Sequence, residues 1–263
     1  MTNYREFACV TAVALLLGTN TMAADVSPLL VPSQEPAEVQ DAWSFAVSPY
    51  FWAAGMSGKT KQFGLPTVKI DADFGDIFNN LDFAFMAAAE ARYDRYSVIG
   101  DFMYVKLSAD GHTPFGVVAN DVDVDSTTFA GLLGAGYAIV DDPSARLDIV
   151  GGVKVWSVDT SLSFNGGLLN GRQADDSATW VDAMVGLRGK YNITPEWFLS
   201  GWGLVGAGGA DIDWDVAAAV GYQFNDTVSA IAGYRAVGVD YRNDGFVFDA
   251  VQQGPILGVT MRF

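Results

Sequence analysis

The sequence is poor in cysteine, histidine and charge, and these shortages narrow the classes of protein it can belong to. Cys9 is the only cysteine, so the chain after it has no disulfide framework and no thiolate metal site. Charged residues make up 17% of the chain, whereas about 25% is typical of a soluble domain. The net charge of −16 argues against nucleic acid as a partner, because binding phosphates needs clustered Lys and Arg.

No apolar run is long enough for a transmembrane helix, which needs about 20 residues. The best candidate after the first 24 residues, Ala130 to Val140, is short and rich in glycine. Residues 1–24 combine Arg5, an apolar core from Phe7 to Gly18 and a final stretch of small residues. They predict a secretory signal peptide cut after Ala23 or Ala24. If the mature chain lies in a membrane, it must do so as a closed β-barrel.

Residues 25–42 contain Pro28, Pro32 and Pro36 among Ser, Gln and Glu, which predicts a linker without packed structure. From residue 43 onwards, apolar residues alternate with small or polar ones, and this period of two indicates β-strands. The alternating segments are 43–53, 81–93, 96–108, 129–139, 146–155, 181–191, 197–207, 214–224, 227–241 and 246–263. In 96–108 and 197–207 the pattern does not show which set of residues faces outwards. We count ten strands, with eight or twelve as alternatives.

The connections between these segments alternate in length. Short turns at 94–95, 141–144, 192–195 and 225–226 alternate with expected loops at 55–80, 109–124, 160–176 and 242–245, apart from a tight turn near 208–213. Aromatic residues flank the short turns: Tyr93, Tyr137, Tyr191, Trp197, Tyr222, Phe224 and Phe263. Together these features predict an all-β fold, a transmembrane antiparallel up-and-down β-barrel with an aromatic girdle. A soluble sandwich or lipocalin-like barrel fits less well, because the more polar face carries too few charges for an exterior.

The last segment, Gly254 to Phe263, ends the sequence on an aromatic residue. An open strand edge is not tolerated in lipid, so we expect this strand to pair with the strand from Trp43 and close the barrel. Pro255 has no amide hydrogen to donate, so a bulge or the loop-side end of that pairing is expected there.

Over residues 43–263 the sequence resembles the small outer-membrane β-barrel proteins of Gram-negative bacteria, broadly the OmpA-like and porin-like barrels. The most specific element is the terminal pattern Met261-Arg262-Phe263. The resemblance implies that Val259, Met261 and Phe263 form a signal for the barrel-assembly machinery. It also implies a cell outer membrane location with both termini periplasmic, among lipid and lipopolysaccharide. The acidic, proline-bearing segment 25–42 is similar to that of α-proteobacterial barrels.

The more polar face of the strands carries both acids and bases: Glu90, Arg92, Arg146, Asp148, Lys154, Asp182, Arg188, Lys190, Asp215, Arg235 and Arg262. We interpret them as a salt-bridged network that largely plugs the lumen, because an unpaired buried charge costs several kcal/mol. The alternative is a narrow porin-like channel for small solutes, although water-filled channels usually need about 16 strands or more.

The expected outer loops and rims are acidic: they carry Asp110, Asp121, Asp123, Asp125, Asp159, Asp175, Asp176, Asp211, Asp213, Asp240, Asp244 and Asp249. Of these, Asp121, Asp123 and Asp125 alternate along one short segment. Three carboxylates on one face could bind Ca²⁺ or Mg²⁺. The segment lacks the glycine and the final glutamate of a Ca²⁺ hand loop, so a solvated acidic rim is the preferred interpretation.

Enzymatic activity and cofactors are not expected. The only histidine, His112, follows Asp110 in a segment flanked by Gly and Pro. Such a segment does not hold an acid–base pair in place, and spacing marks no nucleophile, so a hydrolase using His112 is the least favoured function.

Residues 71–81 do not alternate cleanly. Phe74, Ile77, Phe78 and Leu81 recur at helical spacing, so the sequence leaves two alternatives open. The segment is either a short helix that caps or enters the barrel mouth, or the outer half of the second strand.

Overall fold

The computed structural model describes residues 43–112 and 121–263, and within them one antiparallel sheet contains twelve strands. The strands are β1 (Ser44–Trp52), β2 (Gly55–Lys61), β3 (Val68–Ala72), β4 (Leu81–Tyr93), β5 (Tyr96–His112), β6 (Asp121–Asp141), β7 (Ala145–Asn165), β8 (Arg172–Asn192), β9 (Trp197–Gly208), β10 (Ile212–Gln223), β11 (Val228–Asn243) and β12 (Phe246–Arg262). A helix, α1 (Phe74–Asn79), precedes β4, and a 3-10 turn, η1 (Gly167–Leu169), separates β7 from β8.

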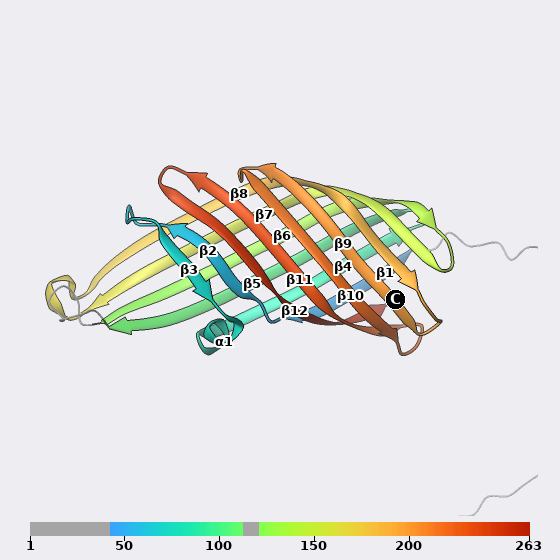
Figure 1. The fold of residues 1–263 in the computed structure, drawn as a ribbon, viewed down its shortest axis with the longest axis horizontal. Helices are drawn as coiled ribbons and strands as arrows, with labels where there is room; N and C mark the ends of the chain where they lie inside the picture. Colours follow the sequence, from blue (N-terminus) through green and yellow to red (C-terminus); the bar gives the residue numbers. More distant parts are fainter. Residues whose placement is uncertain (1–42, 113–120) are drawn as a thin grey trace, which may run out of the picture. The chain divides into compact units, whose positions relative to one another are not determined.

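Ten of the strands close into a barrel, as the alternation predicts. Strand β1 pairs with β4 on one side and with β12 on the other, while β4 to β12 each pair with the next strand (Figure 1). The pairing of β1 with β12 is the seam of the barrel, and it ends in two reciprocal backbone hydrogen bonds. The Phe45 amide donates to the Phe263 carbonyl at 3.1 Å, and the Phe263 amide donates to the Phe45 carbonyl at 2.9 Å. The predicted pairing of the last strand with the first is confirmed.

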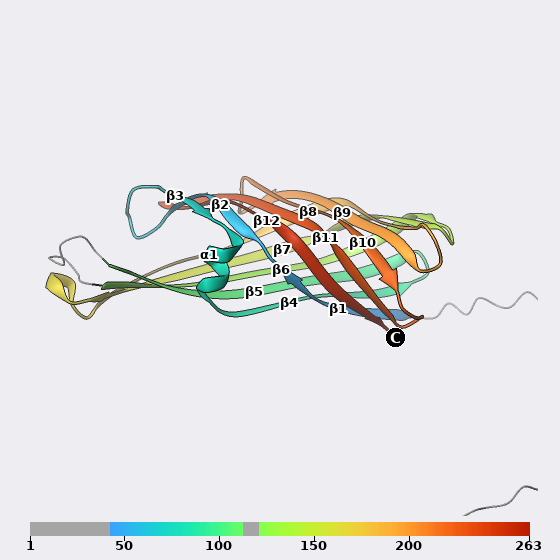
Figure 2. The ribbon, with the colours of Figure 1, turned by 60° about the horizontal axis from the view of Figure 1, so that its bottom comes forward.

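The segment expected to be the loop 55–80 instead forms a hairpin, β2 and β3, followed by α1. The hairpin extends the sheet from the loop-side half of β12. Figure 2 shows the hairpin and α1 beside each other on one side of the barrel. This expectation was wrong because β12 is longer than β1, and its outer half offers free backbone groups with which β2 pairs.

The loops expected at 109–124 and 160–176 are also largely strand. Strand β5 runs to His112, β6 begins at Asp121, and β7 and β8 are separated only by residues 166–171. These strands project beyond the others at what we call the long-loop end, opposite the short-turn end that holds residues 94–95 and Phe263 (Figure 1). The polar residues there had suggested a loop, but the backbone ladder continues through them.

Residues 74–79 settle the open choice within 71–81 in favour of a helix. Asp73 caps it: its side chain accepts from the Asp76 amide at 2.9 Å, and the Asp76 carboxylate accepts from the Asp73 amide at 3.2 Å. The ring of Phe74 packs edge-on against Phe51, an exposed residue of β1, at 5.9 Å. The helix therefore packs on the outer face of the wall, and the expectation that it caps or enters the mouth was wrong.

The outer face carries the apolar residues of the alternation. Exposed examples from four strands are Leu133, Val153, Val185 and Leu257. At the short-turn end, exposed and half-buried aromatic residues form a girdle with ring contacts such as Tyr96–Tyr137 at 5.3 Å and Trp197–Tyr222 at 5.0 Å. Among the described residues, no helix has the length and apolar character needed to cross a membrane.

Candidate functional site in the barrel lumen

The inward-facing side chains form three zones along the lumen. We call them, from the long-loop end, the aromatic layer, the charged layer and the vestibule. The aromatic layer is built around Trp156, Trp180 and Tyr241, whose rings stack with centroids 6.0 and 4.1 Å apart. Phe246 and Phe248 at the start of β12 are buried in the same cluster. This part of the lumen is therefore occupied by a cluster of buried hydrophobic side chains.

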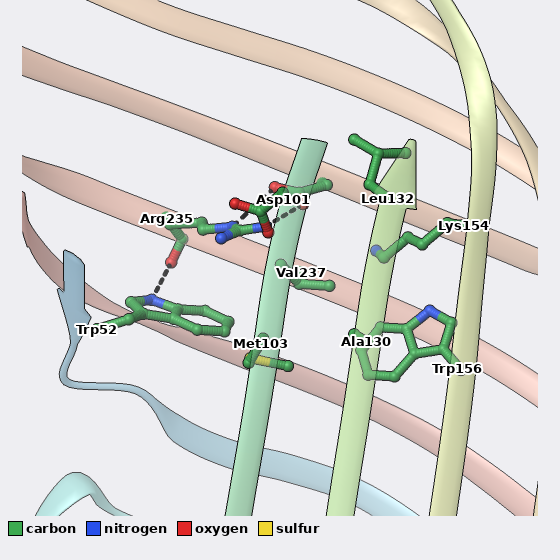
Figure 3. Close-up of a pocket in the computed structure, with 10 residues that line it drawn as sticks. Trp52, Asp101, Met103, Ala130, Leu132, Lys154, Trp156, Arg235 and Val237 are labelled. Carbon is green, nitrogen blue, oxygen red and sulfur yellow. Dashed lines mark hydrogen bonds and ion pairs between the residues drawn. The ribbon is translucent and has the colours of Figure 1, made fainter. Parts of the chain in front are cut away.

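The charged layer is centred on Arg235 of β11, which is 5% exposed. Its guanidinium group donates to Asp215 at 2.6 Å and 3.1 Å and to Asp101 at 3.0 Å, and also to the Tyr50 hydroxyl at 2.8 Å. It lies over the ring of Trp52, 5.3 Å from the centroid. In Figure 3 the Arg235–Asp101 pair meets above Trp52, whose indole nitrogen donates to the Arg235 carbonyl. Four of the five N–H groups of the guanidinium therefore donate to these partners.

A second buried pair lies beside the first. Lys154 of β7 donates to Asp213 at 2.8 Å, and the Trp156 indole donates to the other oxygen of Asp213 at 2.7 Å. Trp156 thus joins the charged layer to the aromatic layer. The void between the two pairs, lined by Trp52, Arg235, Lys154 and Trp156 among others, is about 10 Å³, which is roughly the room that one water molecule needs. The two layers together occupy the middle and the long-loop side of the lumen.

The vestibule is a cavity of about 380 Å³ between the charged layer and the short-turn end, lined by both charged and apolar side chains. Glu90 of β4 pairs with Arg92 at 2.6 Å and with Arg188 of β8 at 3.0 Å. Arg188 reaches Glu90 from a strand that does not neighbour β4 in the sheet, so this ion pair crosses the lumen. Arg146 binds Asp148 and Asp141, each at 3.0 Å.

The structure brings the predicted lumen charges together in these zones. Lys154, Asp215 and Arg235 lie in the charged layer, and Asp182 is buried beside it, where it accepts from the amide of Ala210 at 2.8 Å. The remaining seven line the vestibule: Glu90, Arg92, Arg146, Asp148, Arg188, Lys190 and Arg262.

Sequence reasoning missed two acids of the charged layer. Asp101 lies in the segment 96–108, where both faces mix polar and apolar residues and the facing was ambiguous. Asp213 was assigned to the acidic outer rim, which was wrong: it is 0% exposed and paired with Lys154. The signal was present, because Asp213 and Asp215 are two residues apart on one strand and so share a face.

The acidic segment Asp121, Asp123 and Asp125 opens strand β6. Asp125 accepts from Ser108 at 2.5 Å, and Asp123 accepts from Asn165 at 2.7 Å. In the part of the chain that the structure describes, no three His, Cys, Asp or Glu side chains gather as a metal site. The side chain of His112 lies outside the described residues.

Comparisons with known proteins place the fold in a class. The barrel is similar to the outer membrane protease OmpT from Escherichia coli, with 10% identity over 85% of this chain and 98% of that chain and a TM-score of 0.51. The translocator domain of the autotransporter NalP from Neisseria meningitidis gives 13% identity over 86% and 90%, with a TM-score of 0.47. The attachment invasion locus protein Ail of Yersinia pestis gives 14% over 85% and 99%, with a TM-score of 0.37.

No family model and no curated protein matches the sequence. At such low identity the likeness to OmpT shows the fold alone. The chain has the fold of an outer-membrane β-barrel: ten antiparallel strands closed on themselves, with an apolar outer face and a polar or packed inner face.

Proposed function

We propose that the protein is an integral outer-membrane β-barrel with a structural or surface role and a closed lumen. The observation that carries the proposal is the junction at Asp213, which binds Lys154 of the charged layer and Trp156 of the aromatic layer. Both layers are buried, and the void left between their side chains is no larger than about one water molecule. In this proposal a hydrated solute finds no continuous path past these two layers of described residues.

The proposal includes the setting of the barrel. The exposed apolar belt and the girdle at the short turns support insertion in a lipid bilayer. We place the short-turn end and both termini in the periplasm, after removal of residues 1–24. Lipid and lipopolysaccharide then surround the barrel, the barrel-assembly machinery reads Val259, Met261 and Phe263, and the source is α-proteobacterial in type. No catalytic activity and no cofactor are part of the proposal.

Planar-bilayer recording tests the closed lumen. Purified wild-type protein, shown to be folded by a heat-modifiable gel shift, is expected to give no reproducible single-channel steps. A variant with Trp156, Trp180 and Arg235 replaced by Ser is the comparison, because it removes the centre of both layers. Folded variant protein is expected to conduct. Reproducible steps from the wild type would overturn the closed-lumen proposal.

The second candidate is a narrow channel for small solutes. It is favoured by one observation: the vestibule already extends from the short-turn end up to Asp101 and Asp215, so only two layers of side chains separate it from the other end. The same recording distinguishes the two functions.

A further inference from the structure

The vestibule holds more cations than its carboxylates pair with. Six acids and six bases line it, so its total charge is balanced. The acids and bases are not evenly paired, however. Asp101 and Asp215 bind Arg235, while Asp141 and Asp148 bind Arg146. A further acid, Asp142, is an exposed residue of a short turn.

One carboxylate, Glu90, is left to face four cations: Arg92, Arg188, Lys190 and Arg262. Glu90 binds Arg92 and Arg188. Among the described residues, Lys190 and Arg262 form no ion pair. The Lys190 ammonium group lies over the ring of Phe198 at 4.2 Å, and Arg262 donates to the Gln223 side-chain oxygen at 2.7 Å.

Strand register explains why these groups face one another. Ala46 of β1 pairs with Arg262 of β12 on one side and with Glu90 of β4 on the other, so all three lie at the same level of the wall. Lys190 lines the same cavity, where the positive charges of Arg262 and Arg92 act on it against the single negative charge of Glu90. Holding partly buried like charges together is unfavourable unless an anion joins them.

We infer that the vestibule binds a small multivalent anion between Lys190, Arg262 and Arg92. Carboxylate and phosphate groups are the chemistry that such a cluster recognises, since Arg and Lys donate charge-assisted hydrogen bonds to both. A cavity of about 380 Å³ is in the range of small-molecule sites and accommodates an organic anion as well as an inorganic one.

Residues with hydroxyl groups line the same cavity beside the cations. Ser48 and Thr260 are hydrogen-bonded at 2.8 Å across the seam, and Ser229 of β11 is the strand partner of Thr260. Ser229 is fully buried and lines the cavity, and among the described residues its hydroxyl has no hydrogen-bond partner. The inference does not depend on whether the lumen is closed, because Lys190, Arg262 and Arg92 lie on the short-turn side of the two layers in either case.

Isothermal titration calorimetry of the folded full-length mature barrel, in zwitterionic detergent at low salt, tests the inference. Sodium phosphate and sodium succinate are the two probes, and their relative affinity distinguishes an inorganic anion from an organic dicarboxylate. Saturable binding of at least one probe is expected, weakening as salt is added. Lys190→Gln and Arg262→Gln are each expected to weaken it about tenfold, as loss of one charge-assisted hydrogen bond does.

Two further variants make the result specific. Glu90→Gln removes the acid that competes with the ligand, so binding is expected to tighten severalfold. Arg242→Gln removes the same charge from an exposed site at the long-loop end and is expected to leave affinity unchanged. Each variant is first shown to be folded by the gel shift. Absence of saturable binding of both probes to the wild type would overturn the inference, as would binding that Lys190→Gln and Arg262→Gln leave unchanged.

Discussion

The carbonyl oxygen of Pro255 accepts a hydrogen bond from the amide of Ala53 at 2.9 Å, and the reciprocal bond cannot form because proline has no amide hydrogen. This half-made pair lies where β1 ends and β2 begins. On the short-turn side of this pair, β1 pairs with both β12 and β4. On the long-loop side, β2 takes the place of β1 beside β12, but the other neighbour of β2 is β3 and not β4. Within the described residues, 81–86 of β4 pair with β5 alone.

Gly254 beside this break is expected to tolerate no side chain. A Cβ atom there would overlap the backbone carbonyl of Ala53. Gly254→Ala should therefore destabilise the barrel by roughly 1–3 kcal/mol, as overpacking does. Gly151→Ala is the matched control, because a Cβ atom at Gly151 meets nothing within 4 Å. Urea unfolding measures the stability of both variants. Equal stability would contradict the close approach of Gly254 to the Ala53 carbonyl.

Removing Arg235 should cost much more than removing an exposed arginine. Arg235→Ala leaves the carboxylates of Asp215 and Asp101 buried without their cation, and breaking such a pair costs roughly 3–5 kcal/mol. Arg242 pairs with Asp240 in a solvent-exposed position, so Arg242→Ala should cost about 0–1 kcal/mol. Unfolding midpoints in the same lipid or detergent give the comparison. A small loss for Arg235→Ala would mean that water enters the charged layer.

The apolar belt predicts a depth-dependent cost for an outward-facing charge. Leu133 is 61% exposed, two outward positions from the girdle residue Tyr137 on β6. Leu133→Arg should destabilise the barrel in phospholipid vesicles by about 2–4 kcal/mol, whereas Tyr137→Arg should cost about 0–1 kcal/mol near the interface. If the two substitutions are equally well tolerated, this face does not contact lipid.

Deletion of Phe263 should impair assembly more than truncation of its side chain. The deletion removes both backbone hydrogen bonds to Phe45, whereas Phe263→Ala keeps them and loses only the exposed ring. The fraction of heat-modifiable barrel in outer-membrane extracts measures the difference. Wild-type levels of folded protein after the deletion would show that the seam closes without this last pair.

The sequence by itself determined the barrel because the patterns that specify a barrel lie within single strands and turns. A period of two along each strand settles which residues face outwards, and the short turns set the order of neighbours. This is why the outer belt, the girdle, the ten strands and the β1–β12 seam were predictable. All eleven predicted lumen charges lie inside for the same reason. The alternation was uninformative only where both faces were mixed, as around Asp101.

Pairing across the lumen was decided by the tertiary structure alone. Asp213 meets Lys154 from a strand far away in sequence, and the Arg188–Glu90 pair depends on the curvature and register of the closed sheet. The break opposite Pro255, and the hairpin that follows it, also depend on two strands of unequal length meeting at the seam. Periodicity specifies the face of each residue, but only closure of the barrel specifies which side chains meet inside it.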